Sequence, residues 1–178
     1  MGYMGHDLIL APHIDDEVIG CFELLKYNVD ACCDIIYFYD ITDERKEAIP
    51  RLKNRFRLVN DVFFNNENIE FNLNNIEDYL EKYDRIFCPD PIFETHPDHK
   101  ELGNLASYIF KNYDWFNDVV FYTVNMQAPY VRKLVKEEIE DKRNCLNEIY
   151  PDQKSLWESD YKYFLFEGSC KWLSNHQE

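Results

Sequence analysis

Residues 8–20 read LILAPHIDDEVIG, an apolar run that stops at His13 and is followed by three consecutive acids. The run before Pro12 is typical of a buried strand, and the apolar residues after the acids recur at helical spacing, which predicts a strand–turn–helix unit. Two interpretations of Asp15, Asp16 and Glu17 are open. The acids interact favourably with the dipole of a helix N-terminus, or the turn is built to hold a metal ion.

The rest of the chain repeats this alternation of strand and helix. Helices are expected at 17–27, 75–83, 99–113 and 131–150, with one from about 44 to 64 that is interrupted or restarted near Pro50 and a largely helical tail. Strands are expected at 7–11, 33–41, 69–73, 84–89 and 118–125. These strands are apolar throughout, as when helices cover both faces of a parallel sheet. The pattern predicts an α/β fold, a Rossmann-like three-layer α/β/α sandwich with a mainly parallel sheet of about five strands.

Composition limits the classes of partner. The chain has 178 residues, which fits one domain spanning 1–178, and it carries a net charge of −15. Such a charge repels nucleic acids and anionic membranes, although a locally positive pocket for a charged small substrate remains compatible with it. No segment reaches the roughly 20 apolar residues of a membrane span, and the N-terminus lacks the features of a signal peptide. The six cysteines form no C-x-x-C pair, so reduced thiols and a cytoplasmic location are expected; the oligomeric state is not indicated.

A second group of polar residues lies in PDPIFETHPDHK at 89–100, directly after the predicted strand 84–89. Ligands of open parallel sheets bind beyond the carboxyl ends of the strands, so this loop and the turn at His13 should face one edge. His13, Asp16 and His99 would then supply two imidazoles and one carboxylate. Catalytic zinc sites use such a set and leave one coordination position for water.

The neighbouring residues suggest roles in catalysis. If His13, Asp16 and His99 hold a metal, Asp15 should be turned aside from it yet close to its open position, where a general base for the bound water should stand. Asp98 lies two residues from His96 and could orient that imidazole and hold it protonated. A structural alternative treats HPDH as a turn with Pro97 at the first helical position. A chemical alternative is the facial triad of non-haem Fe(II) oxygenases, which usually occurs on β-sandwich folds.

These stretches resemble a known family. APHIDDE at 11–17 and HPDH at 96–99 are similar to the two signatures of the PIG-L/LmbE-like deacetylases, and KRNCLNEIYPDQ at 142–153 is similar to a third segment of that family. The resemblance implies zinc, with Fe²⁺ or another divalent ion as alternatives, held by His13, Asp16 and His99. It also implies Asp15 as base, and His96, positioned by Asp98, as the residue that stabilises or protonates the tetrahedral intermediate.

The implied activity is a metal-dependent hydrolase that removes an N-acetyl group from an N-acetylated amino sugar or sugar conjugate. The alternatives are an amidase acting on another N-acyl conjugate and an inactive member that binds sugars or a partner. The chain departs from the family at Ile14, where proline is usual, and at Phe22 and Glu23, which replace a glycine pair and are expected to narrow or reshape the pocket. Candidates for a substrate-binding arginine are Arg51, Arg55 and Arg57.

Overall fold

The structure is a computed structural model that describes residues 5–28, 31–69, 76–112, 118–124, 128–159 and 162–171. Its centre is a sheet in the order β3-β2-β1-β4-β5-β8. The first five strands are parallel, as predicted, and β8 pairs antiparallel with β5. The strands are β1 (Gly5–Ala11), β2 (Ala31–Tyr37), β3 (Val59–Phe64), β4 (Arg85–Pro89), β5 (Asp118–Tyr122) and β8 (Ser169–Lys171), while β6 (Arg132–Lys133) and β7 (Phe166–Glu167) form a separate pair.

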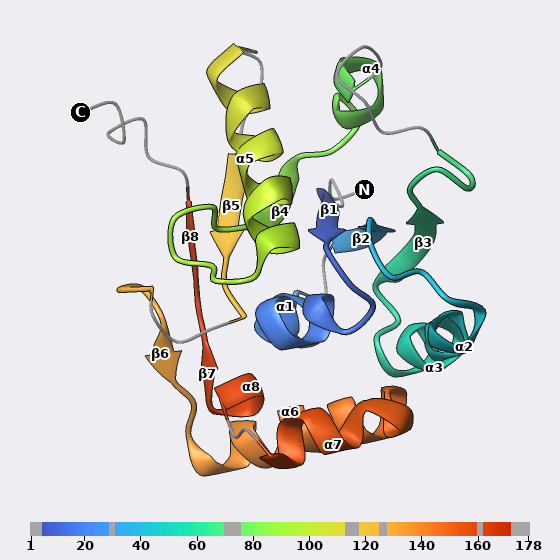
Figure 1. The fold of residues 1–178 in the computed structure, drawn as a ribbon, viewed down its shortest axis with the longest axis vertical. Coiled ribbons are helices and arrows are strands. Elements are labelled where there is room, and N and C mark those ends of the chain that lie inside the picture. The colour runs from blue at the N-terminus through green and yellow to red at the C-terminus, as the bar shows by residue number, and fades with distance from the viewer. Residues whose placement is uncertain are drawn as a thin grey trace.

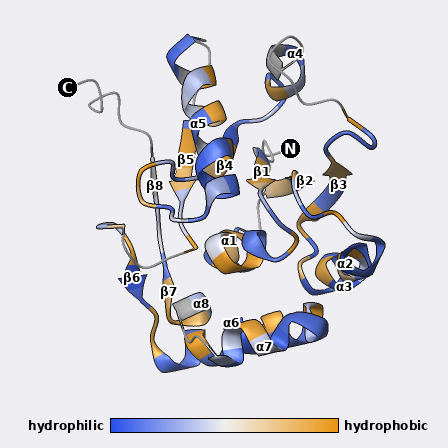
Figure 2. Cartoon of the chain, viewed as in Figure 1, coloured by the Kyte–Doolittle hydropathy of each residue, from blue (hydrophilic) through white to orange (hydrophobic). Residues whose placement is uncertain are grey.

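Helices cover both faces of the sheet, which confirms the predicted three-layer α/β/α sandwich (Figure 1). They are α1 (Asp16–Tyr27), α2 (Asp43–Lys46), α3 (Ala48–Arg55), α4 (Ile76–Leu80), α5 (Pro97–Asn112), α6 (Lys136–Ile149), α7 (Lys154–Ser159) and α8 (Lys162–Leu165), with a short 3₁₀ turn at Pro151–Gln153. Alternate strand residues enter two cores. Ile9 and Ile35 pack with α1, α3 and α6, whereas Leu8 and Leu10 pack with α4 and α5. Figure 2 shows apolar residues on the central strands, β1 and β5 among them.

Local signals explain several helix starts. Asp16 and Glu17 occupy the first turn of α1, where negative charge is favourable. The Thr42 hydroxyl caps α2 by accepting from the backbone N–H of Arg45 at 3.3 Å. Pro97 begins α5, a position where its missing N–H has no cost. Among the described residues, no helix is long and apolar enough to cross a bilayer.

The helix expected from 44 to 64 is wrong in its second half. Pro50 lies in the first turn of α3, and that helix ends at Arg55. The β-branched and aromatic residues that follow form β3, which pairs parallel with β2; pairing with a ready sheet edge outweighs the helical periodicity. The strand expected at 69–73 lies outside the described residues except for Ile69, which forms one isolated bridge with Asn65.

The tail also differs from its largely helical prediction. The helix expected from 131 begins at Lys136, because 132–133 form β6 and pair with β7. Lys133 therefore lies outside the helix that contains Glu137, while Lys136 and Glu140, both within α6, are 3.9 Å apart. The described part of the chain ends with the short strands β7 and β8. Segments of two or three residues show too little periodicity to distinguish a strand from a helix.

The topology defines one binding edge. From β1 the chain runs through β2 to β3 on one side, and then crosses to β4 on the other side of β1. The crevice at the carboxyl ends of β1 and β4 is thus a topological switch point, where open α/β folds bind ligands. The turn at His13 follows β1, and the loop that leads to His99 follows β4.

Candidate metal centre

The structure brings His13, Asp16 and His99 together at this edge. Nδ1 of His13 and Nε2 of His99 each lie 3.1 Å from the same Asp16 oxygen, and the two nitrogens are 3.4 Å apart. Asp16 and His99 are buried and His13 is half-buried. Ligands about 2.0–2.2 Å from a tetrahedral zinc ion are roughly 3.3 Å from one another. The three donor atoms therefore have the spacing and the chemistry to hold one divalent ion.

Each imidazole has a carboxylate at its second nitrogen. Glu94 lies 3.2 Å from Nδ1 of His99, and Asp98 lies 3.0 Å from Nε2 of His13. Such outer carboxylates fix the tautomer and the ring orientation of a histidine ligand. Glu94 is almost fully buried and also accepts the backbone N–H of Val124 at 2.6 Å, so its position is well determined.

His96 lies beside this group and is exposed on about half of its side chain. Its Nδ1 accepts the backbone N–H of Asp98 at 3.3 Å, which leaves Nε2 as the protonated atom of the neutral ring. The Asp98 carboxylate is 3.7 Å from His96 and thus nearer to His13. His13, His96 and Asp98 form a second possible ligand set, but a neutral His13 imidazole has one lone pair, so this set and the first compete for it.

Asp15 occupies an unusual backbone conformation with φ of 147°. Residues other than glycine rarely adopt this region, and conformations of this kind cost of order 1–3 kcal/mol and cluster at functional sites. Its side chain is 8% exposed, lines the same cavity as the three candidate ligands, and accepts no hydrogen bond from any described residue. A carboxylate placed in this way is available to accept a proton from a molecule in the cavity.

Burial and mutual charge perturb the acids strongly. Burial, together with the charges of Asp16 and Glu17, raises the pKa of Asp15 well above its usual value. Burial would also raise the pKa of Asp16, but His99 and His13 outweigh it and hold that pKa low. Burial opposes protonation of His99, yet Asp16 and Glu94 together raise its pKa to about 10. The group thus attracts positive charge, which protons or a divalent cation can supply.

The centre opens into a cavity of about 480 Å³. Ile19, Val124, Leu156, Trp157 and Tyr163 form apolar parts of its lining, and the polar parts include Asp40, Arg45, Thr95 and His96. Arg45 was not predicted as a site residue. Its guanidinium forms no hydrogen bond or ion pair within the described residues, so it is available to an anionic group.

The arginines chosen from the sequence contact protein groups instead. Nε of Arg51 donates to the carbonyl of Ile149 at 2.7 Å, and Arg55 pairs with Asp141 at 2.9 Å. Arg57 lines a different cavity, between α1, β2 and α3.

Phe22 and Glu23 do not line the cavity at the metal centre, contrary to the expectation that they narrow it. Phe22 is buried in the core, and Glu23 pairs with Arg132. Close backbone packing occurs instead at Gly20, where a Cβ would lie 2.3 Å from the ring of Tyr122.

Comparisons with known proteins establish the fold alone. No family model matches the chain, and no curated protein matches it. The crystal structure of GalB, the 4-carboxy-2-hydroxymuconate hydratase from Pseudomonas putida KT2440, superposes with a TM-score of 0.61 over 96% of this chain and 97% of that one, at 11% sequence identity. This likeness supports the Rossmann-like α/β architecture.

Proposed function

We propose that the protein is a metal-dependent hydrolase, with zinc as the expected ion, that removes an N-acetyl group from an N-acetylated amino sugar or sugar conjugate. The observation that carries the proposal is the convergence of His13, Asp16 and His99 on one point, with the uncommitted Asp15 carboxylate in the same cavity. The substrate class comes from the resemblance of the two loop motifs to the PIG-L/LmbE-like deacetylases.

A divalent ion held by these three residues would supply Lewis-acid chemistry, lowering the pKa of a coordinated water and polarising an amide carbonyl. Asp15 would take a proton from the attacking water, because its carboxylate is free of hydrogen bonds from the described residues. His96 would donate a hydrogen bond from Nε2 to the oxygen of the tetrahedral intermediate, and the backbone N–H of Asp98 orients the ring for this. The proton taken up by Asp15 would then pass to the departing amine. Glu94 and Asp98 keep the two imidazole ligands in place.

Two features of the cavity bear on the substrate. Arg45 favours a conjugate that carries a carboxylate or phosphate, because an unpaired guanidinium recognises such groups. The apolar lining at Ile19, Val124 and Trp157 can cover the face of a ring or an acyl methyl group. Arg45 favours a charged sugar conjugate over a free neutral sugar, whereas the apolar lining fits the N-acetyl sugar of either.

The test is metal analysis of the purified protein followed by acetate release from N-acetylglucosamine, its UDP form and its malate conjugate. We expect about one divalent ion per chain and hydrolysis of at least one charged conjugate. Metal content with no acetate release from any of these would contradict the deacetylase proposal. Hydrolysis of a compound with a different N-acyl group would then support an amidase. No hydrolysis of any N-acyl compound would support a binding protein.

The same experiment should include an unsaturated 2-hydroxy acid of the kind named for the structural neighbour. The hydratase activity belongs to that protein, and we expect no water addition here. Hydration in place of hydrolysis would leave the metal assignment intact and replace the proposed reaction.

A further inference from the structure

The turn after β1, His13–Glu17, reads HIDDE, and its third acid, Glu17, has no role in the proposed chemistry. Glu17 is completely buried and, unlike Asp15 and Asp16, does not line the cavity of the metal centre. An acid at a helix N-terminus is normally solvated, so its full burial requires specific partners. Two of those partners lie in the turn itself and in the C-terminal part of the chain, and Tyr37 of β2 also faces this carboxylate.

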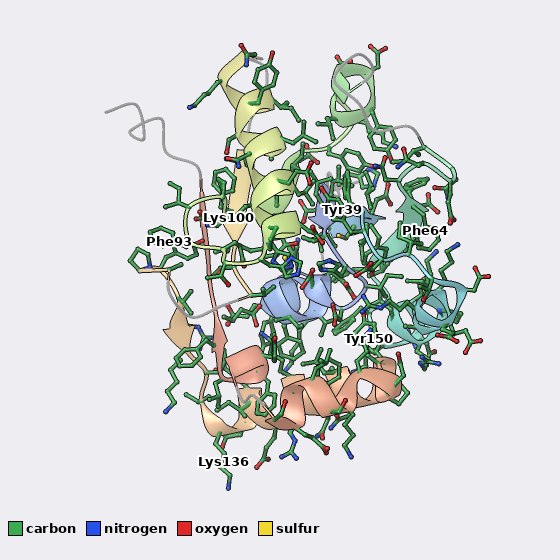
Figure 3. All side chains as sticks on the ribbon, viewed as in Figure 1. Tyr39, Phe64, Phe93, Lys100, Lys136 and Tyr150 are labelled. Atoms are coloured by element: carbon green, nitrogen blue, oxygen red, sulfur yellow. The ribbon has the colours of Figure 1, made fainter. Side chains whose placement is uncertain are left out.

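One Glu17 oxygen accepts the backbone N–H of Asp15 at 3.1 Å, and the other accepts the hydroxyl of Tyr150. Tyr150 is fully buried at the end of α6 and lies between α1 and the pair α6–α7 (Figure 3). Nε2 of Gln153 also donates to the carbonyl of Ile14 at 3.4 Å. The segment Tyr150–Gln153, written YPDQ, therefore contacts the turn through residues that do not line the cavity.

These contacts act on the residue whose backbone is most unusual. Asp15 has φ of 147°, and its carbonyl accepts the N–H groups of Val18 and Ile19, each at 3.0 Å. Its own N–H is held by Glu17 alone among the described residues. A backbone conformation of this kind persists only when several contacts with the surrounding structure hold it in place. The Glu17 carboxylate supplies the contact on the N-terminal side of Asp15.

We propose that Glu17 and Tyr150 are positioning residues that hold the strained backbone of Asp15 and so aim its carboxylate into the cavity. Tyr150 fixes Glu17, and Glu17 fixes the Asp15 N–H, without either residue touching the substrate or the ion. This inference rests on the proposed function for its catalytic consequence, but the conformational consequence is independent of it.

Two substitutions separate this role from an acid–base role of Glu17. In Glu17→Gln the amide oxygen can accept the Asp15 N–H while the amide NH₂ donates to the Tyr150 oxygen, so both contacts survive. Glu17→Gln should therefore keep turnover within about threefold of the wild type. Tyr150→Phe removes the group that fixes Glu17, and we expect kcat to fall on the order of 10- to 100-fold at unchanged KM, as for a small misplacement of a reacting group.

The matched control is Tyr83→Phe. The Tyr83 hydroxyl also donates to a buried carboxylate, that of Asp34 at 2.8 Å, but away from the cavity. Both tyrosine variants should lose thermal stability to a similar extent and retain the bound metal, whereas only Tyr150→Phe should lose turnover.

A measurement that does not depend on activity completes the test. Hydrogen exchange of the Asp15 amide, followed by NMR on the metal-loaded protein, should be slow in the wild type, Glu17→Gln and Tyr83→Phe, and at least tenfold faster in Tyr150→Phe. Unchanged exchange in Tyr150→Phe would overturn the proposal, as would loss of turnover in Glu17→Gln or loss of metal in Tyr150→Phe. If the wild type releases no acetate, the exchange result still decides the positioning role, while the proposed function fails separately.

Discussion

Buried acids occur in two regions of the sheet, and their surroundings differ. In the amino-terminal half of the strands, Arg85 pairs with both oxygens of Asp7. Nearby, Asp34 accepts from Tyr83, from Asn60 and from the N–H of Asp61. At the carboxyl edge, the turn buries three acids in a row, and no Lys or Arg of the described chain lies within ion-pair distance of them.

The difference indicates what each region is for. Buried acids that serve stability are paired and hydrogen-bonded within the protein, as at Asp7 and Asp34. At the carboxyl edge Asp16 faces two imidazoles and the backbone N–H of His13, and the Asp15 side chain accepts no hydrogen bond from the described residues. Buried negative charge left in this state disfavours the apo protein unless a cation binds. This difference supports the proposal that the carboxyl edge holds a cation, whereas the acids of the amino-terminal half have their partners within the protein.

The largest expected effect comes from substitution of Asp15, whose carboxylate accepts no hydrogen bond from the described residues. Asp15→Asn removes the proposed base but keeps a side chain that tolerates positive φ. Turnover should fall on the order of 10²- to 10⁴-fold while metal content stays at the wild-type level. Acetate release and metal analysis on the same preparation measure both quantities. Equal loss of metal would show that Asp15 belongs to the ligand set.

Glu94→Gln tests whether a buried acid at the carboxyl edge works through the metal. The glutamine oxygen can face either His99 or the N–H of Val124, and its NH₂ must then oppose the other partner. Metal affinity should fall roughly 10- to 100-fold, as for other outer carboxylates. Competition with a fluorescent chelator measures it.

Glu101→Gln is the control for this substitution. Glu101 lies on the same helix as His99 and accepts the hydroxyl of Tyr39 at 3.1 Å, a contact that glutamine can preserve. An equal loss of metal affinity in both variants would show that Glu94 does not act specifically by positioning His99.

Arg45→Ala tests the one Lys or Arg side chain that lines the cavity among the described residues. KM for a charged conjugate should rise about tenfold, within the range for hydrogen bonds to charged groups, and KM for a neutral N-acetyl sugar should not change. Lys46→Ala is the control, because Lys46 lies on the same short helix but pairs with Glu67 at 2.7 Å. A similar increase of KM for both substrates would show that Arg45 shapes the cavity instead of recognising charge.

Spacing along the chain was sufficient to predict the three candidate ligands, because the carboxyl ends of parallel strands meet at one edge. Glu94 and Arg45 were not predicted, since Glu94 lies in the loop after β4 and Arg45 in the short helix α2, and the sequence does not show that either segment borders the cavity. The HIDDE and YPDQ motifs were recognised, but their contact joins residues 133 positions apart and no local pattern encodes it. The strand at 59–64 was misassigned for a similar reason, because its pairing with β2 is a tertiary interaction.

The smallest expected effect concerns Asp34, the buried acid that is hydrogen-bonded within the protein. Burial alone would raise the pKa of Asp34, but Tyr83, the Asp61 N–H and Asn60 together lower it. The folded-state pKa is below the unfolded value of about 3.9, so this group stabilises the fold at neutral pH and loses its contribution as the pH falls below about 4.

Asp34→Asn should therefore cost about 1–3 kcal/mol at pH 7, and its difference from the wild type should shrink toward pH 3. Urea unfolding at a series of pH values measures this, with the exposed Asp61→Asn as control. The Asp34→Asn difference should be the same with and without a chelator, because a partnered acid in this half of the sheet does not depend on the metal. A chelator-dependent difference would mean that the two regions are coupled, and the contrast between them would no longer identify the carboxyl edge as the cation site.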